Sequence, residues 1–264
     1  MDLGLKDAAA VVVGGGRGMG LAAARCLAGD GARIAVVGRT AAVVSDAATA
    51  LGECGSPDTL GLAADITDAA QVQKVFDEVG ERWGELNILI NAVGPESVGT
   101  FEDLTDEQWR AAFDGGVMGM VHCVRSALPL LRAASWARIV NFSAHSTQRQ
   151  SVILPAYTAA KAALTSVSKN LSLLLAKDEI MVNVVSPGSI ASEALIGWAE
   201  SVGVDGSDPY ALMAAIGEHF GHPAHLPRAG LPDEIGPVVA FLASRRNSYM
   251  TGANVNVDGG SDFT

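Results

Sequence analysis

Short apolar runs that alternate with longer segments of helical periodicity constrain the fold of this 264-residue chain more than any other feature. The apolar runs cover residues 8–13, 33–37, 59–63, 86–91, 138–143, 181–186 and 254–257. The helical segments cover residues 21–28, 41–51, 68–83, 106–131, 156–176 and 232–243. Strands that are apolar throughout, each followed by a helix, are typical of a parallel sheet covered on both faces. The sequence therefore predicts one α/β domain over residues 1–264, with a doubly wound parallel sheet of about seven strands and helices on both faces.

Residues 190–228 interrupt this alternation, because they lack a clear strand and mix glycine and proline with isolated large apolar residues. Long segments of this kind inside a compact domain are usually functional or mobile. The large apolar residues are Leu195, Ile196, Trp198, Met213, Ile216 and Phe220. Two interpretations stay open: a helical hairpin packed on the body of the protein, or a lid over a hydrophobic substrate.

The net charge of the chain limits the kinds of binding partner that we expect. A net charge of -11 argues against a nucleic-acid-binding protein and disfavours attraction to anionic lipid. No apolar run approaches the roughly 18 residues that span a bilayer, so no membrane association is expected. Three cysteines, Cys26, Cys54 and Cys123, lack metal-ligand spacing. They favour small buried side chains in a reducing cytoplasm and no metal site.

A glycine-rich turn directly follows the first apolar run. Its candidate cofactor contacts are Gly14, Gly16, Arg17, Gly18, Met19 and Gly20. Glycines between a first strand and a first helix permit a tight turn and a close approach of the backbone to a pyrophosphate. The helix N-terminus then supplies free N–H groups and the positive end of a dipole. The spacing is Gly-x-x-x-Gly-x-Gly, which differs from the common dinucleotide fingerprint.

The end of the second strand bears on the choice between the two nicotinamide dinucleotides. A carboxylate there would bind the ribose 2′-hydroxyl of NAD, but this chain has Gly38, Arg39 and Thr40. A guanidinium can bind a 2′-phosphate through two hydrogen bonds, and Arg17 could add a second positive contact. The sequence therefore predicts NADP (NADPH) in preference to NAD. The alternative is that Arg39 only caps a loop.

A tyrosine and a lysine four residues apart mark the chemical end of the site. Tyr157 and Lys161 lie at the start of a helical segment, so their side chains share one face. A tyrosine hydroxyl has a pKa near 10, which must fall toward neutrality for proton exchange at pH 7. A neighbouring ammonium group and a nicotinamide cation would lower it.

Taken together, these motifs make the chain resemble the short-chain dehydrogenase/reductases nearly end to end, in particular the 3-oxoacyl reductase-like, NADP-preferring members. The motifs that carry the resemblance are the glycine turn, Asp65-Ile66, Asn91-Ala92-Val93-Gly94, Tyr157-xxx-Lys161, Pro187-Gly188 and Asp258-Gly259-Gly260. The resemblance implies a Rossmann-type sheet and hydride transfer between a nicotinamide and a carbonyl or alcohol.

The resemblance also implies roles for individual residues. Tyr157 would be the general acid/base, and Lys161 would hold the nicotinamide ribose and lower the pKa of the tyrosine. Asp65 and Ile66 would contact the adenine, and Asn91, Ala92, Val93 and Gly94 would lie on the ribose side. Pro187, Gly188, Ser189 and Ile190 would bind the nicotinamide carboxamide. The family usually forms dimers or tetramers, so a homo-oligomer built on residues 106–131 and 156–176 is expected.

Three departures from the family pattern affect this interpretation. Val13 replaces a usual threonine, and the family's Asn-Asn-Ala-Gly is reduced to Asn91-Ala92-Val93-Gly94. Gly116 stands where the family usually has an asparagine that supports a proton-relay water. The family's substrate-binding serine usually lies thirteen residues before the tyrosine, and this chain has Ala144 at that position. Ser143 is the candidate replacement, with Ser146 and His145 close by in the sequence.

The leading hypothesis is an NADP(H)-dependent oxidoreductase acting on a carbonyl or alcohol of a small, fairly hydrophobic substrate. Ala144 and Gly116 keep two alternatives open. One is a reductase of carbon–carbon double bonds conjugated to a carbonyl, and the other is a catalytically weak NADP-binding scaffold or sensor. Losing one oxyanion-type donor typically costs about a hundred- to a thousandfold in rate, which an enzyme could survive.

Overall fold

One parallel sheet of seven strands forms the centre of the computed structural model, which describes residues 2–221 and 223–261. The strand order is β3-β2-β1-β4-β5-β6-β7. The strands are β1 (Ala9–Val13), β2 (Arg33–Gly38), β3 (Thr59–Ala63), β4 (Ile88–Asn91), β5 (Ala137–Phe142), β6 (Ile180–Pro187) and β7 (Asn254–Val257). Every neighbouring pair is parallel, and Val12 of β1 lies in register with Val36 of β2 and Ile90 of β4.

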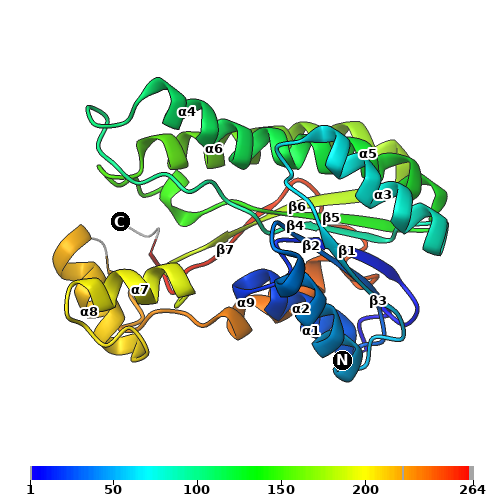
Figure 1. Ribbon diagram of the computed structural model, residues 1–264, viewed down its shortest axis with the longest axis horizontal. Coiled ribbons are helices and arrows are strands. Elements are labelled where there is room, and N and C mark those ends of the chain that lie inside the picture. The colour runs from blue at the N-terminus through cyan, green and yellow to red at the C-terminus, as the bar shows by residue number, and fades with distance from the viewer. Residues whose placement is uncertain (1, 222, 262–264) are drawn as a thin grey trace.

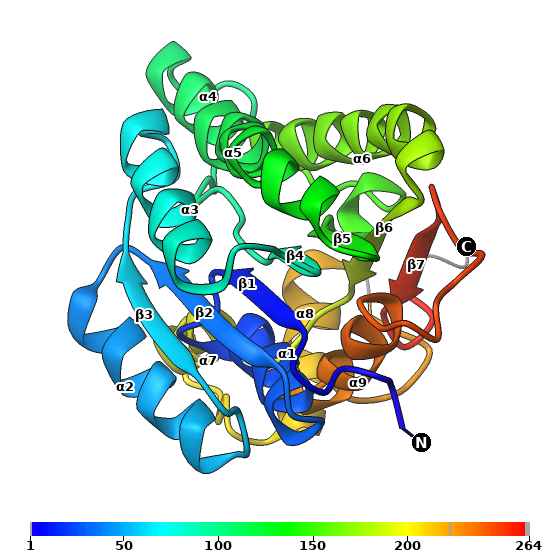
Figure 2. The same ribbon diagram turned by 90° about the vertical axis from the view of Figure 1, so that its right-hand side faces the viewer.

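Helices cover both faces of this sheet (Figures 1 and 2). One face carries α3 (Ala69–Trp83), α4 (Asp106–Phe113), α5 (Gly119–Ala133) and α6 (Pro155–Leu175). The other carries α1 (Gly18–Gly29), α2 (Ala41–Glu53) and α9 (Pro232–Leu242). Each face of the sheet has its own buried cluster of aliphatic side chains, because consecutive strand residues point to opposite faces. The predicted doubly wound fold is confirmed.

The helix predicted over residues 106–131 is interrupted, which corrects the sequence-based expectation. A five-residue π-helical turn, Asp114–Met118, separates α4 from α5. A Cβ atom at Gly116 would lie 2.9 Å from the Cβ of Ala160, so the chain passes α6 at a distance that only glycine permits. Glycine is also a poor helix former, and π-helical turns often mark functional sites.

The segment 190–228 forms two short helices, α7 (Glu193–Ser201) and α8 (Pro209–Phe220). They share a separate apolar cluster, in which the ring centroids of Trp198 and Phe220 are 4.7 Å apart. A single bridge between Ile190 and Gly230 ties the base of the segment together. Its structure is thus the predicted helical hairpin, and its action as a lid stays a prediction.

The three cysteines are free and differ in exposure. Cys123 is buried, Cys26 is intermediate and Cys54 is exposed, so burial of all three was too broad an expectation. Within the described residues, no helix has both the length and the hydropathy needed to cross a bilayer. The same residues contain no cluster of three or more metal-ligating side chains.

Candidate functional site

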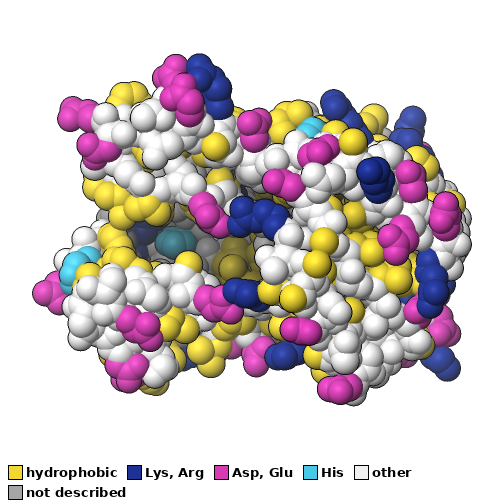
Figure 3. All heavy atoms as spheres, viewed as in Figure 1, with side chains coloured by type: hydrophobic (Ala, Val, Ile, Leu, Met, Phe, Trp, Pro, Cys, Tyr) yellow, Lys and Arg dark blue, Asp and Glu magenta, His cyan; other side chains and the backbone are white. Residues whose placement is uncertain are grey.

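The candidate site lies where the strand order reverses, at the carboxyl ends of β1 and β4. In open parallel sheets this switch point leaves a crevice that binds ligands. Figure 3 shows a hollow between the α4 side and the α7–α8 side, with hydrophobic side chains on its rims. Acidic and basic side chains meet where the hollow narrows. The predicted motifs therefore converge on one edge of the sheet.

In the glycine turn, Gly14 and Gly20 are packed so closely against backbone that a side chain at either position is excluded. Gly14 has a φ of 78° and donates its N–H to Val37 O at 2.8 Å. A Cβ at Gly14 would lie 2.7 Å from Ala92 O, and one at Gly20 would overlap the carbonyl of Gly14. Arg17 stands at the N-cap of α1, and its side chain makes no capping hydrogen bond. Backbone N–H groups of the first turn of α1 are thus available for an anion.

The two arginines predicted to select NADP are both ion-paired. Arg17 Nη1 is 2.9 Å from Glu193 Oε2 at the start of α7, and Arg39 Nη2 is 3.0 Å from Glu96 Oε1. All four side chains are exposed. Thr40 is the N-cap of α2 but its side chain makes no capping hydrogen bond. Sequence reasoning missed Glu96 and Glu193, because pairs 57 and 176 residues apart leave no local pattern.

The end of β3 supplies the predicted adenine contacts. The Asp65 carboxylate accepts hydrogen bonds from the N–H and the hydroxyl of Thr67, at 2.9 and 2.8 Å. These bonds, with a smaller contribution from the Arg39 charge, hold the pKa of Asp65 below its usual range. Ile66 packs against Gly119, and its carbonyl accepts a hydrogen bond from Nδ1 of His122 at 2.9 Å.

The loop after β4 connects the cofactor side to the chemical side. Asn91 Nδ2 donates to Asn141 Oδ1 at 2.8 Å, while Asn91 Oδ1 is buried with no hydrogen-bond partner among the described residues. Ala92 donates its N–H to Val13 O. A Cβ at Gly94 would lie 3.3 Å from Lys161 Cε, so this glycine keeps backbone beside the lysine.

Tyr157 and Lys161 come together in the first turns of α6, which begins at Pro155. Lys161 is 2% exposed, and its Nζ donates to Phe142 O at 2.6 Å and to Val93 O at 3.0 Å. The same Nζ lies 6.0 Å from the centroid of the Tyr157 ring. The shared helical face predicted from the four-residue spacing is therefore present.

Burial shifts both groups toward their neutral forms. It raises the pKa of Tyr157 to about 12 and lowers the pKa of Lys161 to about 7. The sequence argument required a lowered tyrosine pKa, so the protein by itself shows the opposite direction. Desolvation penalises the charged form of both groups. The two carbonyl groups beside the Lys161 ammonium accept its hydrogen bonds, but they carry no negative charge that would offset this penalty. A positive charge on a bound ligand would favour the phenolate and so lower the pKa of Tyr157, but it would lower the pKa of Lys161 further.

Around Ala144, the hydroxyl groups point to α6. Ser143 Oγ donates to Lys161 O at 3.3 Å and accepts from Thr165 Oγ1 at 2.7 Å. Ser146 is buried, and its Oγ accepts from Thr158 Oγ1 at 3.3 Å. This geometry does not support Ser143 as a donor to a substrate; its hydroxyl instead supports the backbone of α6.

His145 takes a different direction from the two serines. Its Nδ1 lies 3.1 Å from Pro187 O, and a carbonyl can only accept, so Nδ1 carries the proton. This contact holds the turn after β5 against the end of β6. The side chain of Arg149, which sequence reasoning missed, donates to Ser261 O at 2.7 Å and Pro223 O at 3.3 Å.

The residues predicted near a nicotinamide carboxamide run from the end of β6 to the base of α7. Gly188 donates to Val257 O at 3.1 Å, and a Cβ there would lie 2.6 Å from Asp258 Cα. Ser189 O accepts from the N–H of Gly230 at 3.0 Å. Backbone contacts thus fix Pro187, Gly188, Ser189 and Ile190 beside the carboxyl end of β7.

These features fit a nicotinamide dinucleotide. A glycine cradle that Cβ atoms would fill, a helix N-terminus without a side-chain cap and two arginines at the rim suit a phosphorylated ligand. The orphaned Asn91 Oδ1 and the buried Lys161 add polar groups along the same edge. The chain thus has the groups to bind both ends of such a cofactor.

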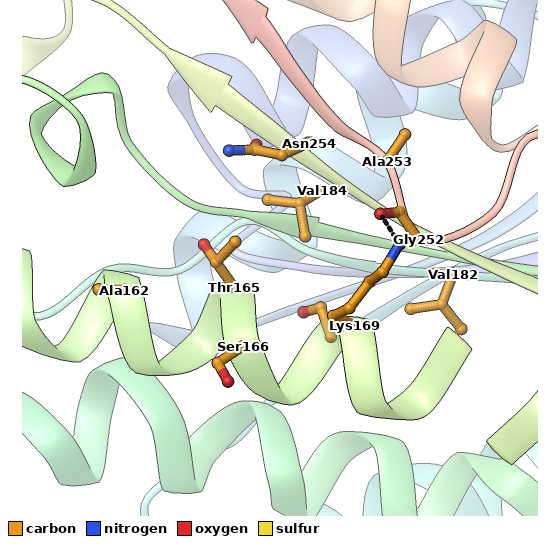
Figure 4. A pocket seen from close by; sticks show the side chains of 10 residues that line it. Ala162, Thr165, Ser166, Lys169, Val182, Val184, Gly252, Ala253 and Asn254 are labelled. Carbon is orange, nitrogen blue, oxygen red and sulfur yellow. Dashed lines mark hydrogen bonds between the residues drawn. The ribbon is translucent and has the colours of Figure 1, made fainter. Parts of the chain in front are cut away.

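A second depression lies behind α6, away from Tyr157. It has a volume of about 390 Å³ between α6 and the edge formed by β6 and β7 (Figure 4). Lys169 Nζ donates there to Gly252 O at 3.0 Å. Small side chains such as Ala162, Thr165 and Ser166 form much of its helical wall. It contains no part of the predicted proton-transfer pair.

Comparison with known proteins gives consistent similarities over the whole chain. A family model described as Enoyl-(Acyl carrier protein) reductase matches residues 13–262. An uncharacterized oxidoreductase of Methylorubrum extorquens is 32% identical, covering 97% of this chain and 98% of the relative. Galactitol 2-dehydrogenase of Agrobacterium fabrum is 28% identical, covering 97% and 98%. The crystal structure of L-sorbose reductase from Gluconobacter frateurii with NADPH and L-sorbose has a TM-score of 0.93 and 31% identity, covering 100% of both chains.

Proposed function

Because this chain belongs to the short-chain dehydrogenase/reductase family, we propose that it uses NADPH to reduce a ketone on a small, fairly hydrophobic substrate, or runs the reverse oxidation. The observation that carries the proposal is the Tyr157–Lys161 pair on α6, placed beside Gly94 at the edge where the glycine turn lies. Relatives that act on alcohol or ketone groups, such as the galactitol dehydrogenase, support the reaction class.

The proposed proton transfer uses this chain's own residues. When bound, NADPH supplies the hydride that reduces the carbonyl carbon. The hydroxyl of Tyr157 donates its proton to the carbonyl oxygen, which gives the alcohol and leaves a phenolate. Lys161, held by Phe142 O and Val93 O, stabilises that phenolate when protonated. Burial lowers the pKa of Lys161 to about 7, so part of the lysine population is protonated at neutral pH and able to stabilise the phenolate.

The preference for NADPH over NAD rests on the rim of the site. Arg17 and Arg39 are the cationic groups at the glycine turn and at the end of β2, where an NAD-binding carboxylate is missing. The similarity to the NADPH-complexed L-sorbose reductase supports this preference. We also propose the contacts with adenine, ribose and carboxamide that the family resemblance implies, and the positions of these residues at the strand ends support them.

Replacement of Tyr157 tests the proposal. In Tyr157→Phe, NADPH oxidation with a panel of ketones should fall by about a hundred- to ten-thousandfold, the range typical for removal of general acid catalysis. NADPH affinity, followed by quenching of protein fluorescence, should change by less than about threefold. Tyr249→Phe is the matched control, because Tyr249 is 99% exposed. Full turnover by Tyr157→Phe would refute the proposed role.

Reduction of a conjugated carbon–carbon double bond is the second candidate. The observation that favours it is the turn at Ala144, where Ser143 and Ser146 both bind α6 groups. The matching family model carries an enoyl reductase description. Matched ketone and enone substrates, with products separated by chromatography, distinguish the two reactions. Tight NADPH binding without transfer to either substrate would instead support a scaffold or sensor.

We also propose that the chain forms a homo-oligomer through α5 and α6. Leu173 and Leu174 near the end of α6 are 71% and 53% exposed, and the depression behind α6 adds an indented surface. Exposed apolar groups of this kind are typical of contact surfaces when they are contiguous. Sedimentation velocity of the wild type and of a Leu173→Glu, Leu174→Glu variant tests the assembly.

A further inference from the structure

The end of β2 has no carboxylate of its own, but the loop after β4 places the carboxylate of Glu96 beside Arg39. Arg39 follows β2, and its Nη2 lies 3.0 Å from Oε1 of Glu96. The charge of Arg39 also acts on Asp65 at the end of β3. The guanidinium therefore stands between acidic groups from two other strand ends.

Packing fixes the base of the loop that carries Glu96. A Cβ at Gly116 would lie 3.2 Å from Cδ and Cγ of Pro95, so the proline ring packs against the π-helical turn. Gly94 is held beside Lys161 and Tyr157 in the same way. The two residues before Glu96 are thus held in place, Gly94 beside α6 and Pro95 against the π-helical turn. Glu96 follows immediately and extends toward Arg39.

The ion pair itself is weak and exchangeable. The side chains of Arg39 and Glu96 are 72% and 86% exposed, and pairs this exposed contribute little to stability. A phosphate monoester carries close to two negative charges at neutral pH and offers three acceptor oxygens. It would displace a carboxylate from the guanidinium, and Glu96 would then face an anion of the same sign. A ribose 2′-hydroxyl would leave the pair intact.

We propose that Glu96 is a specificity-determining residue, whose carboxylate competes with the 2′-phosphate of NADP(H) for Arg39 and so narrows the selectivity over NAD(H). This inference rests on the proposed NADPH preference, since it assumes that Arg39 receives the 2′-phosphate. Its new content is an acid from the β4 loop that opposes this contact. The ion pair of Arg17 with Glu193 repeats the arrangement on the α7 side of the rim.

Ligand fragments isolate the contact. The affinities of 2′,5′-ADP and 5′-ADP are measured by calorimetry for the wild type, Glu96→Gln, Arg39→Ala and the double variant. Glu96→Gln should tighten binding of 2′,5′-ADP by about two- to fivefold, the range of an exposed ion pair, and leave 5′-ADP within experimental error. In the Arg39→Ala background the same substitution should have no effect. Glu107→Gln is the charge-matched control, because Glu107 forms an exposed pair with Arg110 within α4.

The outcomes separate the inference from the function on which it rests. Equal affinity of the wild type for both fragments, unchanged by Arg39→Ala, would refute the NADPH preference itself. If Arg39→Ala weakens 2′,5′-ADP but Glu96→Gln leaves it unchanged or weaker, the competitor role of Glu96 is refuted. An equal gain for both fragments, or the same gain in Glu107→Gln, would also refute it. NADPH and NADH Michaelis constants of Glu96→Gln should follow the fragments.

Discussion

The end of α6 that carries Tyr157 and Lys161 and the α7–α8 hairpin border the same hollow, but they are anchored in different ways. Lys161 is almost fully enclosed and binds two backbone carbonyls, and a Cβ at the neighbouring Gly94 would lie only 3.3 Å from its Cε. The hairpin packs around a cluster of its own, centred on Trp198, Met213 and Ile216. Arg17–Glu193, an exposed ion pair, links it to the glycine turn.

Because of this difference in anchoring, the two regions should tolerate substitutions to different extents. The geometry beside α6 tolerates few substitutions, because a Cβ at Gly94 or Gly116 would crowd the side chains of Lys161 or Ala160. The hairpin needs only an apolar inner face, which many sequences provide. We therefore expect substitutions near Tyr157 and Lys161 to affect the reaction itself, and substitutions in the hairpin to affect the choice of substrate.

The largest effect is expected from filling the glycine cradle. In Gly20→Ala, the new methyl group would overlap the carbonyl of Gly14, so the turn must move. NADPH affinity should fall by about a hundredfold, equivalent to about 2.7 kcal/mol. Overpacking should destabilise the fold by about a further 1–3 kcal/mol. Fluorescence titration and urea unfolding measure the two effects.

Gly29→Ala is the control in the same helix. Nothing lies within 4 Å of a Cβ at Gly29, and the residue has helical φ. This substitution should leave NADPH affinity unchanged and stabilise the protein by about 0.5–1 kcal/mol. Comparable losses in both variants would show that the cradle is less constrained than its contacts indicate.

Removal of the buried lysine should change the pH dependence of stability. The native pKa of Lys161 is about 7, below the usual value near 10.4 in the unfolded chain. Between these values the unfolded chain binds the additional proton, so stability rises with pH by about 1.4 kcal/mol per unit. The raised pKa of Tyr157 acts only above pH 10 and leaves this window unaffected.

Lys161→Met should therefore lose the rise between pH 7 and 9, a difference of about 2.3 kcal/mol relative to the wild type, because the slope is only half its full value at pH 7. Urea unfolding of the ligand-free protein at pH 7, 8 and 9 measures it. Lys177→Met removes an exposed lysine from the turn after α6 and should keep the wild-type slope. A slope retained in Lys161→Met would show that the lysine is not desolvated as the structure indicates.

A substitution in the π-helical turn should change the stability of the fold by an intermediate amount. Gly116→Asn would restore the residue usual in the family, but its Cβ would lie 2.9 Å from that of Ala160 and 3.2 Å from the ring of Pro95. We expect a loss of about 1–3 kcal/mol of stability and no gain in activity. Adding Ala160→Gly should recover part of that stability, because it removes the nearer contact.

Thermal unfolding and NADPH oxidation of the single and double variants provide the measurement. A stable, more active Gly116→Asn single variant would contradict the packing argument. It would instead indicate that this chain is a weakened enzyme, which lacks the polar relay group and has room for it.

The fold and the rigid part of the site could be predicted because they depend on local patterns. The strands over residues 59–63 and 254–257 lie within the predicted limits, since apolar runs bounded by turn residues mark them clearly. Gly14, Gly20, Tyr157 and Lys161 follow from spacing within one turn or helix. Within the glycine turn, and likewise between Tyr157 and Lys161, the separation in the sequence is short, so the geometry within each motif is a local property.

Features that depend on distant packing could not be predicted. The break at Gly116 arises from the approach of Ala160 and Pro95, which no helical periodicity reveals. Ser143 stood in the expected region, but its direction depends on the α6 groups it meets. Burial reversed the direction expected for the pKa of Tyr157.

The smallest effect is expected where the hairpin meets the glycine turn. Glu193→Gln removes one partner of an ion pair whose side chains are 60% and 72% exposed. Surface substitutions of this kind usually change stability by less than about 0.5 kcal/mol, and the change should shrink at high salt because of screening. Urea unfolding and kcat/KM at low and high ionic strength test this. A loss above about 1.5 kcal/mol, independent of salt, would mean that Arg17–Glu193 anchors the hairpin, and the two walls of the hollow would then be equally rigid.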